Sequence, residues 1–223
     1  MIRLHIIGEG QTEETFVRNI LSEHLGNFNI STDVRCVETS RKRNKIYRGG
    51  LLDYEKAKQD IQRWMKEDDN LDTRFTTMFD LYALPNNFPY FNESKQQTDP
   101  YQKVKQLEKA FKEDIADDRF IPYIQLHEFE ALILSNPSKF DSCFEEEYSS
   151  QIKELVSLCQ SYASPELIND DPNTAPSKRI KTLISRYNKV SDGSLIAQEI
   201  GLPTIRDKCS HFDEWVRTLE TLR

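Results

Sequence analysis

The first 25 residues predict a strand, a tight turn and a helix in immediate succession. Residues 2–7 are apolar and rich in Ile, and Gly8-Glu9-Gly10 follows them directly, which is typical of a strand that ends in a glycine turn. Thr12 is the expected N-cap of a helix whose apolar side chains recur at helical spacing as far as Leu25. A strand that passes through one turn into a helix begins an α/β unit.

The chain continues this alternation as far as residue 135. We expect further strands at 29–38, 73–81 and 120–126, helices at 54–66 and 100–114, and a short helix or turn at 127–135. This order predicts an α/β fold with a mainly parallel sheet flanked by helices. Beyond residue 136 the expected elements are helices, at 145–162, 177–189, 192–200 and 207–222. We therefore expect an α/β domain at 1–135 and a helical extension at 136–223 that packs on it.

The formal net charge of the 223-residue chain is −7. The molecule as a whole is therefore no general binder of polyanions, and any contact with nucleic acid must come from local basic segments. One basic segment lies at 41–48 and another near residue 178, and solvated charged surface is the alternative interpretation of both. The candidate phosphate-binding side chains are Arg41, Lys42, Arg43, Lys45, Arg48, Lys178 and Arg179.

Neither a targeting segment nor a membrane span is predicted. Nothing in the sequence approaches the roughly 18 consecutive apolar residues of a transmembrane helix, and the N-terminal apolar run is too short for the core of a signal peptide. The four cysteines form no CxxC pair, which argues against a zinc site and a dense disulfide framework. We expect a cytoplasmic protein with reduced thiols and no membrane partner.

Acidic side chains follow three of the predicted strands. Glu9 comes after the first strand, Asp80 ends the third, and Glu128 and Glu130 follow the fourth beside His127. Ligands of open α/β sheets bind beyond the carboxyl ends of the strands, so we expect these side chains in one crevice. Clustered carboxylates repel one another unless a cation neutralises them, and hard oxygen ligands favour Mg²⁺ or Mn²⁺ over zinc.

Three of the candidates, Glu13, Asp80 and His127, have a structural alternative. Glu13 lies four residues after Glu9 and is expected to turn back toward the crevice, but Glu13 and Glu14 in a first helical turn also complement the helix dipole. Asp80 also fits a cap or turn residue, and His127 also fits a buried core histidine. The segment HEFE at 127–130 is not HExxH, which excludes a zincin.

Several segments together resemble a known family. GEGQTEE at 8–14, followed by FDLYALP at 79–85, resembles the TOPRIM fold of topoisomerases, primases and OLD-type nucleases. With LHEFEALIL at 126–134, TAPSKRI at 174–180 and GLPTIRDKCSHFDEWVRTLE at 201–220, the chain is identified as a member of an uncharacterised bacterial TOPRIM-like family, a domain of unknown function. Members of that family are often encoded beside AAA-type ATPases.

The resemblance implies roles for individual residues. Glu9 takes the position of the TOPRIM glutamate, with Glu13 as the second acid of that turn, and Asp80 takes the first position of an acidic pair on a later strand. The second position of the pair is Tyr82, which is not a carboxylate. This departure puts ordinary two-acid metal binding in question.

Two outcomes of that departure stay open. Either Glu128 or Glu130 replaces the missing ligand, or the site binds metal weakly or has lost catalysis. The leading hypothesis is a Mg²⁺- or Mn²⁺-dependent nuclease, a hydrolase of RNA or DNA phosphodiesters. Glu9, Glu13, Asp80, Glu128 and Glu130 are the candidate metal ligands, with Asp80 and Glu13 expected to position the ion. Glu9, Asp80 and His127 are the catalytic candidates, with Glu9 assisting proton transfer.

The expected partners follow from the same resemblance. It implies an AAA-type ATPase as a partner in antiviral defence against phage, besides nucleic acid, and formation of a homo-oligomer is left open. The alternative from another class is a non-catalytic TOPRIM-like protein that binds an ATPase or nucleic acid. A nucleotide-binding regulator has little support, because the sequence contains neither a Walker lysine motif nor a full GxGxxG.

Overall fold

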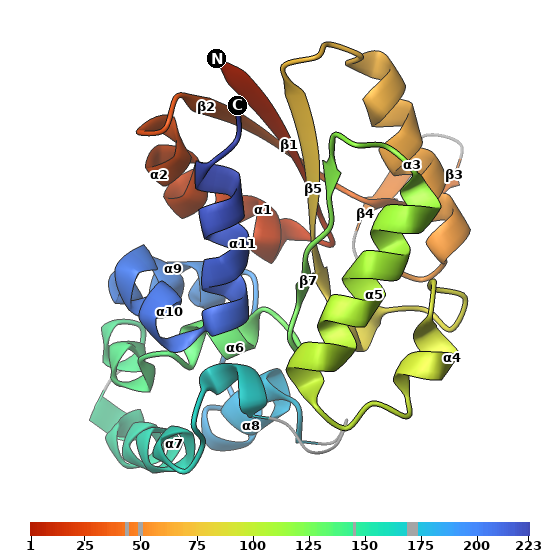
Figure 1. Ribbon diagram of the computed structural model, residues 1–223. Coiled ribbons are helices and arrows are strands. Elements are labelled where there is room, and N and C mark those ends of the chain that lie inside the picture. Colours follow the sequence, from red (N-terminus) through yellow and green to blue (C-terminus); the bar gives the residue numbers. More distant parts are fainter. Residues whose placement is uncertain (43–44, 49–50, 145, 169–173) are drawn as a thin grey trace.

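The computed structural model of the chain describes residues 1–42, 45–48, 51–144, 146–168 and 174–223. At its centre is one sheet in the order β2-β1-β5-β6, with β7 also paired to β5, and all of these pairs are parallel. The predicted α/β fold with a mainly parallel sheet flanked by helices is confirmed (Figure 1). The strands are β1 (Ile2–Gly8), β2 (Ile30–Cys36), β5 (Thr73–Asp80), β6 (Phe120–Ile121) and β7 (Ile124–Gln125).

Strand β1 lies between β2 and β5, so both of its edges are paired, and both of its faces are buried. Leu4 and Ile6 belong to one core cluster and Ile7 to the other, which explains the nearly continuous apolar run of this strand. Figure 1 shows α3 (Tyr54–Glu67) and α5 (Pro100–Ile115) over one face and α11 (Ser210–Glu220) with the first helix over the other. The sheet is thus the middle layer of three.

The first helix begins two residues earlier than the sequence predicts. Gly10, not Thr12, is the N-cap of α1 (Gln11–Phe16), because the Glu13 carboxylate accepts the N–H of Gly10 at 2.9 Å and stabilises the start there. The helix continues through a π-helical turn (Val17–Leu21) into α2 (Ser22–Gly26). One helical rod therefore follows β1, as expected.

The fourth strand is interrupted, which the sequence analysis did not predict. Pro122 separates β6 from β7 and has no N–H to donate to a neighbouring strand. The side chain of Thr77 fills the gap: its hydroxyl donates to Tyr123 O at 2.9 Å and accepts the N–H of Tyr123 at 3.0 Å. The carboxyl end of β7 therefore stays aligned with Asp80 of β5, where Asp80 is paired with Gln125.

The segment at 41–48, expected as a loop or a strand edge, belongs to an antiparallel hairpin of β3 (Glu38–Lys42) and β4 (Lys45–Arg48). Arg43 lies outside the described residues, and so do the side chains of Arg41, Lys42, Lys45 and Arg48. Val37 follows β2 and still donates its N–H to Gly8 O at 3.0 Å. The hairpin begins at the next residue, beside the end of β1.

The helical part departs most from the predicted bounds at two helices. The helix expected at 177–189 ends at Leu183, because Ile184 leaves helical geometry and is buried in the core. The helix expected at 207–222 is broken at Cys209, and the buried carboxylate of Glu166 accepts the N–H groups of His211 and Phe212 at the new helix start. The helices are α4 (Phe91–Ser94), α6 (Glu130–Ile133), α7 (Ser149–Gln160), α8 (Pro176–Leu183), α9 (Ser191–Ile200) and α10 (Leu202–Lys208), and the 3₁₀ turns are Leu81–Ala83, Pro137–Ser142, Glu146–Tyr148 and Pro165–Leu167.

Helix α11 is fixed directly to the sheet. The indole of Trp215 donates to the Thr76 hydroxyl at 2.9 Å and stacks on Tyr123 with ring centroids 4.2 Å apart. The same core cluster contains Leu4 and Val216, so the hydrophobic core extends across residue 135. The division into two units at that residue stays a prediction.

Among the described residues, every helix is too short or too polar to cross a membrane, and no disulfide joins the four cysteines, all of which are described.

Candidate functional site

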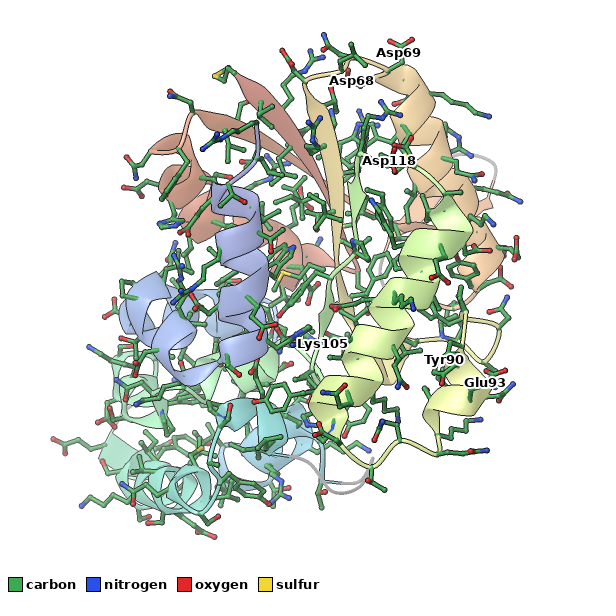
Figure 2. All side chains as sticks on the ribbon, in the orientation of Figure 1. Asp68, Asp69, Tyr90, Glu93, Lys105 and Asp118 are labelled. Carbon is green, nitrogen blue, oxygen red and sulfur yellow. The ribbon has the colours of Figure 1, made fainter. Side chains whose placement is uncertain are left out.

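Because the strands are parallel, the carboxyl ends of β1, β5 and β7 lie together at one end of the sheet, which we call its carboxyl edge. Glu9 directly follows β1, Asp80 is the last residue of β5, and α6 begins at Glu130 shortly after β7. The acidic surface residues Asp68, Asp69 and Asp118 lie at the opposite edge of the sheet (Figure 2). Glu9, Asp80 and Glu130 are all buried, so the chain collects carboxylates inside the molecule at this one edge.

Glu9 is joined to Asp80 through the backbone. The N–H of Asp80 donates to Glu9 Oε1 at 2.8 Å, and both side chains are buried. Burial raises the pKa of Glu9 well above its usual value, and the negative charges of Asp80 and Glu13 raise the pKa further. Glu9 therefore carries a proton at a pH where an exposed glutamate is ionised.

Glu13 belongs to the same group and also caps its own helix. One of its oxygens accepts the N–H of Gly10, so the dipole and capping role considered for Glu13 is present beside its place in the cluster. Burial, followed by the charge of Asp80, raises the pKa of Glu13 to about 7. A Cβ on Gly8 would come within 3.1 Å of the Glu13 Cβ, so the glycine lets the helix approach the end of β1 closely.

Lys189 places its ammonium among these carboxylates. Its Nζ lies 3.1 Å from Asp80 Oδ2, 3.2 Å from Glu130 Oε2 and 4.0 Å from Glu13 Oε1. Burial disfavours the charged form of Lys189, but the charges of Asp80, Glu130 and Glu13 outweigh it and hold the pKa of Lys189 above its ordinary value. The cluster thus contains a cation supplied by the chain itself.

Glu130 is held from two sides. Its side chain is fully buried, Oε2 faces Lys189, and Oε1 accepts the hydroxyl of Tyr187 at 3.3 Å. Burial raises the pKa of Glu130 to about 7, although the charge of Lys189 acts in the opposite direction. A Cβ on Gly193 of α9 would come within 3.0 Å of the Tyr187 hydroxyl, so the absence of a side chain there leaves room for Tyr187.

One ammonium does not balance the charges of this group. Were Glu9, Glu13, Asp80 and Glu130 all ionised beside Lys189, four negative charges would face one positive charge. Asp80 Oδ1 and Glu13 Oε1 are buried and accept no hydrogen bond from the described residues. Buried charge of one sign is costly. The group must therefore retain protons or accept a further cation.

Glu128 is near the group but already engaged. Its two oxygens accept the backbone N–H and the hydroxyl of Ser177 at 2.6 and 3.0 Å, so it supports the first turn of α8. Burial raises the pKa of Glu128, and the negative charge of Asp80 contributes. Between the two glutamates that follow β7, the structure therefore places Glu130 at Lys189 and Glu128 at α8.

His127 and Tyr82 pack together at the same edge. His127 is buried and its φ is 64°, a left-handed conformation that only a minority of non-glycine residues adopt. Its carbonyl accepts the N–H of Tyr82 at 3.0 Å, and the two rings stack with centroids 5.4 Å apart. Tyr82, at the second position of the expected acidic pair, is therefore a partly exposed aromatic residue whose ring stacks on the imidazole of His127.

The predicted basic residues that are described differ in their surroundings. Lys178 is exposed. The Arg179 guanidinium donates to Thr174 O at 2.7 Å and to the Tyr162 hydroxyl at 3.3 Å, which engages it within the protein. Phosphate binding by either side chain stays a prediction.

Sequence reasoning missed Lys189 and Tyr187. Both lie between α8 and α9, in a stretch that the sequence analysis expected to be the end of a surface helix at 177–189. The signal that points to Lys189 is electrostatic: a predicted cluster of buried carboxylates needs a counter-ion, and a lysine of the chain is one source of it. Among the described residues, no three His, Cys, Asp or Glu side chains are already arranged as a metal site.

The chain was compared with known proteins. The model of the family described as "Domain of unknown function (DUF4276)" matches residues 8–220. Two solved structures of the C-terminal region of the Xanthomonas campestris pv. campestris OLD protein are also similar. The structure phased with mercury has 13% identity and a TM-score of 0.37 over 98% of each chain. The structure phased with iodine has 12% identity and a TM-score of 0.40 over 98% of this chain and 97% of the other.

A search of curated proteins found no match. A relation to TOPRIM nucleases stays a prediction.

Proposed function

The chain belongs to the DUF4276 family, and from its carboxylate cluster we propose that it hydrolyses phosphodiester bonds of RNA or DNA with a bound divalent cation. The observation that carries this proposal is the convergence of Asp80, Glu13 and Glu130 on one cation position, the ammonium of Lys189. Glu9 joins the group through the backbone of Asp80. α/β proteins bind their ligands beyond the carboxyl ends of the parallel strands, and these carboxylates lie there.

The donor set fits Mg²⁺ or Mn²⁺. All four side chains offer hard oxygen atoms, the type of ligand that these ions prefer. Asp80 Oδ1 and Glu13 Oε1 are buried without a hydrogen-bond donor among the described residues, and a divalent cation would offset the excess of negative charge. The arrangement is closed around Lys189, so these oxygens would have to reorient slightly to bind an ion.

We assign roles from this geometry. Asp80, Glu13 and Glu130 would hold the ion, which when bound neutralises charge on the phosphate and orients a water molecule. Burial raises the pKa of Glu9 well above its usual value, and a carboxyl group of this kind can exchange a proton with a reacting oxygen. His127 supports the ring of Tyr82 at the rim of the site, which is a positioning role.

The hairpin β3–β4 supports nucleic acid as the substrate. It leaves the sheet beside Glu9, where Val37 N bonds to Gly8 O, and its sequence carries Arg41, Lys42, Arg43, Lys45 and Arg48. A basic segment next to an acidic site would hold the phosphate backbone by charge in a protein of negative net charge. An AAA-type ATPase partner and a role in phage defence remain part of this proposal through the family resemblance alone.

A cleavage assay tests the proposal. Wild-type protein is incubated with mixed single- and double-stranded DNA and RNA, with Mg²⁺, with Mn²⁺ and with EDTA. We expect cleavage with either metal, none with EDTA, and a loss of about 10²-fold or more in Glu9→Gln, the magnitude typical of general acid–base groups. Asp69→Asn, an exposed aspartate at the opposite edge (Figure 2), is the matched control and should cleave normally. Cleavage that resists EDTA, or that survives in Glu9→Gln, would refute the proposal.

A second function has its own support. Lys189 already supplies a cation to the cluster, and Tyr82 stands where a second carboxylate is expected. Both observations favour a non-catalytic protein that binds nucleic acid or an ATPase. In that case the wild type would bind nucleic acid without cleaving it under any metal condition, and Glu9→Gln would bind it equally well.

A further inference from the structure

The ammonium of Lys189 occupies the position that an added cation would take. It makes its two short contacts with Asp80 and Glu130, at 3.1 and 3.2 Å, and lies 4.0 Å from Glu13. These are three of the four carboxylates of the cluster. An ammonium and a divalent ion at the same carboxylates repel each other, so the two cations exclude one another.

The backbone at Lys189 is fixed, whereas its side chain has a path to solvent. Asn188 N donates to Asp192 Oδ2 at 2.7 Å, and Asn188 Oδ1 accepts the N–H groups of Val190 and Ser191. The lysine side chain is 33% exposed, in contrast to 0% for Glu130 and 8% for Asp80. A lysine stem has four rotatable carbons, so the ammonium can leave the carboxylates without any movement of the backbone.

We infer that Lys189 is a tethered counter-ion that keeps the carboxylate cluster closed, and that a divalent cation enters only as the ammonium swings out to solvent. This inference rests on the proposed function in one respect, namely that the entering ion is the divalent cation. It explains why the carboxylates converge although no three of the described candidate ligands are arranged as a metal site. The connection between α8 and α9, which carries Lys189, would thereby determine whether the carboxylate cluster is open to an added cation.

The exchange has a defined thermodynamic consequence. Because wild-type protein must break the contacts of Lys189 before it binds the ion, its apparent metal affinity is lower than that of a protein without the ammonium. Removing a like charge a few ångströms from the ion should tighten binding by about tenfold or more, even with strong screening. A lysine that only stabilised the fold would leave metal affinity unchanged.

Binding of Mn²⁺ and of Mg²⁺, measured by calorimetry in the absence of nucleic acid, tests the inference. Lys189→Met removes the charge and retains most of the stem, and Lys189→Arg retains the charge. Lys181→Met, which removes an exposed lysine of α8, is the matched control. We expect Lys189→Met to bind both ions about tenfold or more tightly than wild type, and the other two variants to bind like wild type.

A thermal unfolding series with and without Mn²⁺ guards against misfolding of the Met variant. The expected result is a larger rise of the unfolding temperature with Mn²⁺ in Lys189→Met than in wild type. Equal or weaker metal binding by a folded Lys189→Met would overturn the inference, and so would its failure to bind either ion. The cleavage assay judges the proposed function separately: cleavage by wild type with equal metal affinities would refute only the tethered counter-ion, and tighter binding without cleavage would refute only the nuclease.

Discussion

The backbone N–H of Asp80 donates to the side chain of Glu9 at 2.8 Å, so the carboxylate that follows β1 holds the end of β5. The bond is buried, and Glu9 is the acceptor whether it is protonated or not. This relationship makes Glu9 a structural residue as well as a catalytic candidate, and two substitutions separate the roles.

Glu9→Gln retains an acceptor oxygen and removes the charge, whereas Glu9→Ala leaves the buried N–H of Asp80 without an acceptor. Burial raises the pKa of Glu9, so ionisation of Glu9 destabilises the folded state at any pH above its unfolded pKa. We expect Glu9→Gln to be at least as stable as wild type at pH 8, and Glu9→Ala to lose about 1–3 kcal/mol of unfolding free energy. Denaturant unfolding measures both. Equal losses in the two variants would contradict a role for the bond.

The pKa of Glu130 predicts a pH dependence of stability. It is raised from 4.5 to about 7 by burial, so the folded state binds more protons than the unfolded state between these values. The contribution of Glu130 to stability therefore falls as the pH rises from about 4.5 to about 7. Glu130→Gln should show a flatter stability profile over this window, by up to about 3 kcal/mol. Parallel profiles for wild type and variant would show that burial of Glu130 has no such effect.

Gly193 should be needed for the position of Tyr187. A Cβ at residue 193 would come within 3.0 Å of the buried Tyr187 hydroxyl that bonds to Glu130. Gly193→Ala should therefore destabilise the protein despite the better helix propensity of Ala, whereas Gly26→Ala, whose Cβ meets nothing within 4 Å, should be neutral or stabilise by up to about 1 kcal/mol. Thermal unfolding of the two variants gives the comparison. A stabilised Gly193→Ala would mean that Tyr187 moves freely.

A buried ion pair outside the carboxylate cluster, between His211 and Glu108, also predicts a pH dependence of stability. His211 Nε2 lies 3.0 Å from Glu108 Oε1. Burial disfavours the imidazolium, but Glu108 outweighs it and raises the pKa of His211. The stabilisation is fully present below the unfolded pKa, about 6.5, and is lost as the pH rises through the folded pKa. His211→Phe should therefore cost more at pH 6 than at pH 8.5, roughly 1–3 kcal/mol at the lower pH. A cost independent of pH would assign the effect to packing alone.

Much of the site was predictable because it depends on local patterns and one topological rule. The glycine turn after β1 and the alternation of strands and helices predict a parallel sheet, and parallel strands end at one edge. That rule places Glu9 and Asp80 together, as the structure has them. The roles of these residues in metal binding and catalysis stay predictions.

The remaining features depend on contacts that no local pattern encodes. Lys189 reaches Asp80 across 109 positions of sequence, and its segment resembles the end of a surface helix. The break at Cys209 depends on the distant carboxylate of Glu166, which caps α11. The choice between Glu128 and Glu130 is made by Ser177 and Lys189, both of which lie in the helical part.

Calorimetric titration of wild type, Asp80→Asn and Asp69→Asn with Mn²⁺ tests most directly our claim that the carboxylates around Lys189 bind a divalent cation. Asp80 makes the shorter of the two closest contacts with the ammonium, whereas Asp69 is exposed at the opposite edge. We predict that wild type and Asp69→Asn bind one Mn²⁺ at concentrations on the order of millimolar or below, and that Asp80→Asn does not. No binding by wild type with or without nucleic acid, or equal binding by Asp80→Asn, would contradict the claim.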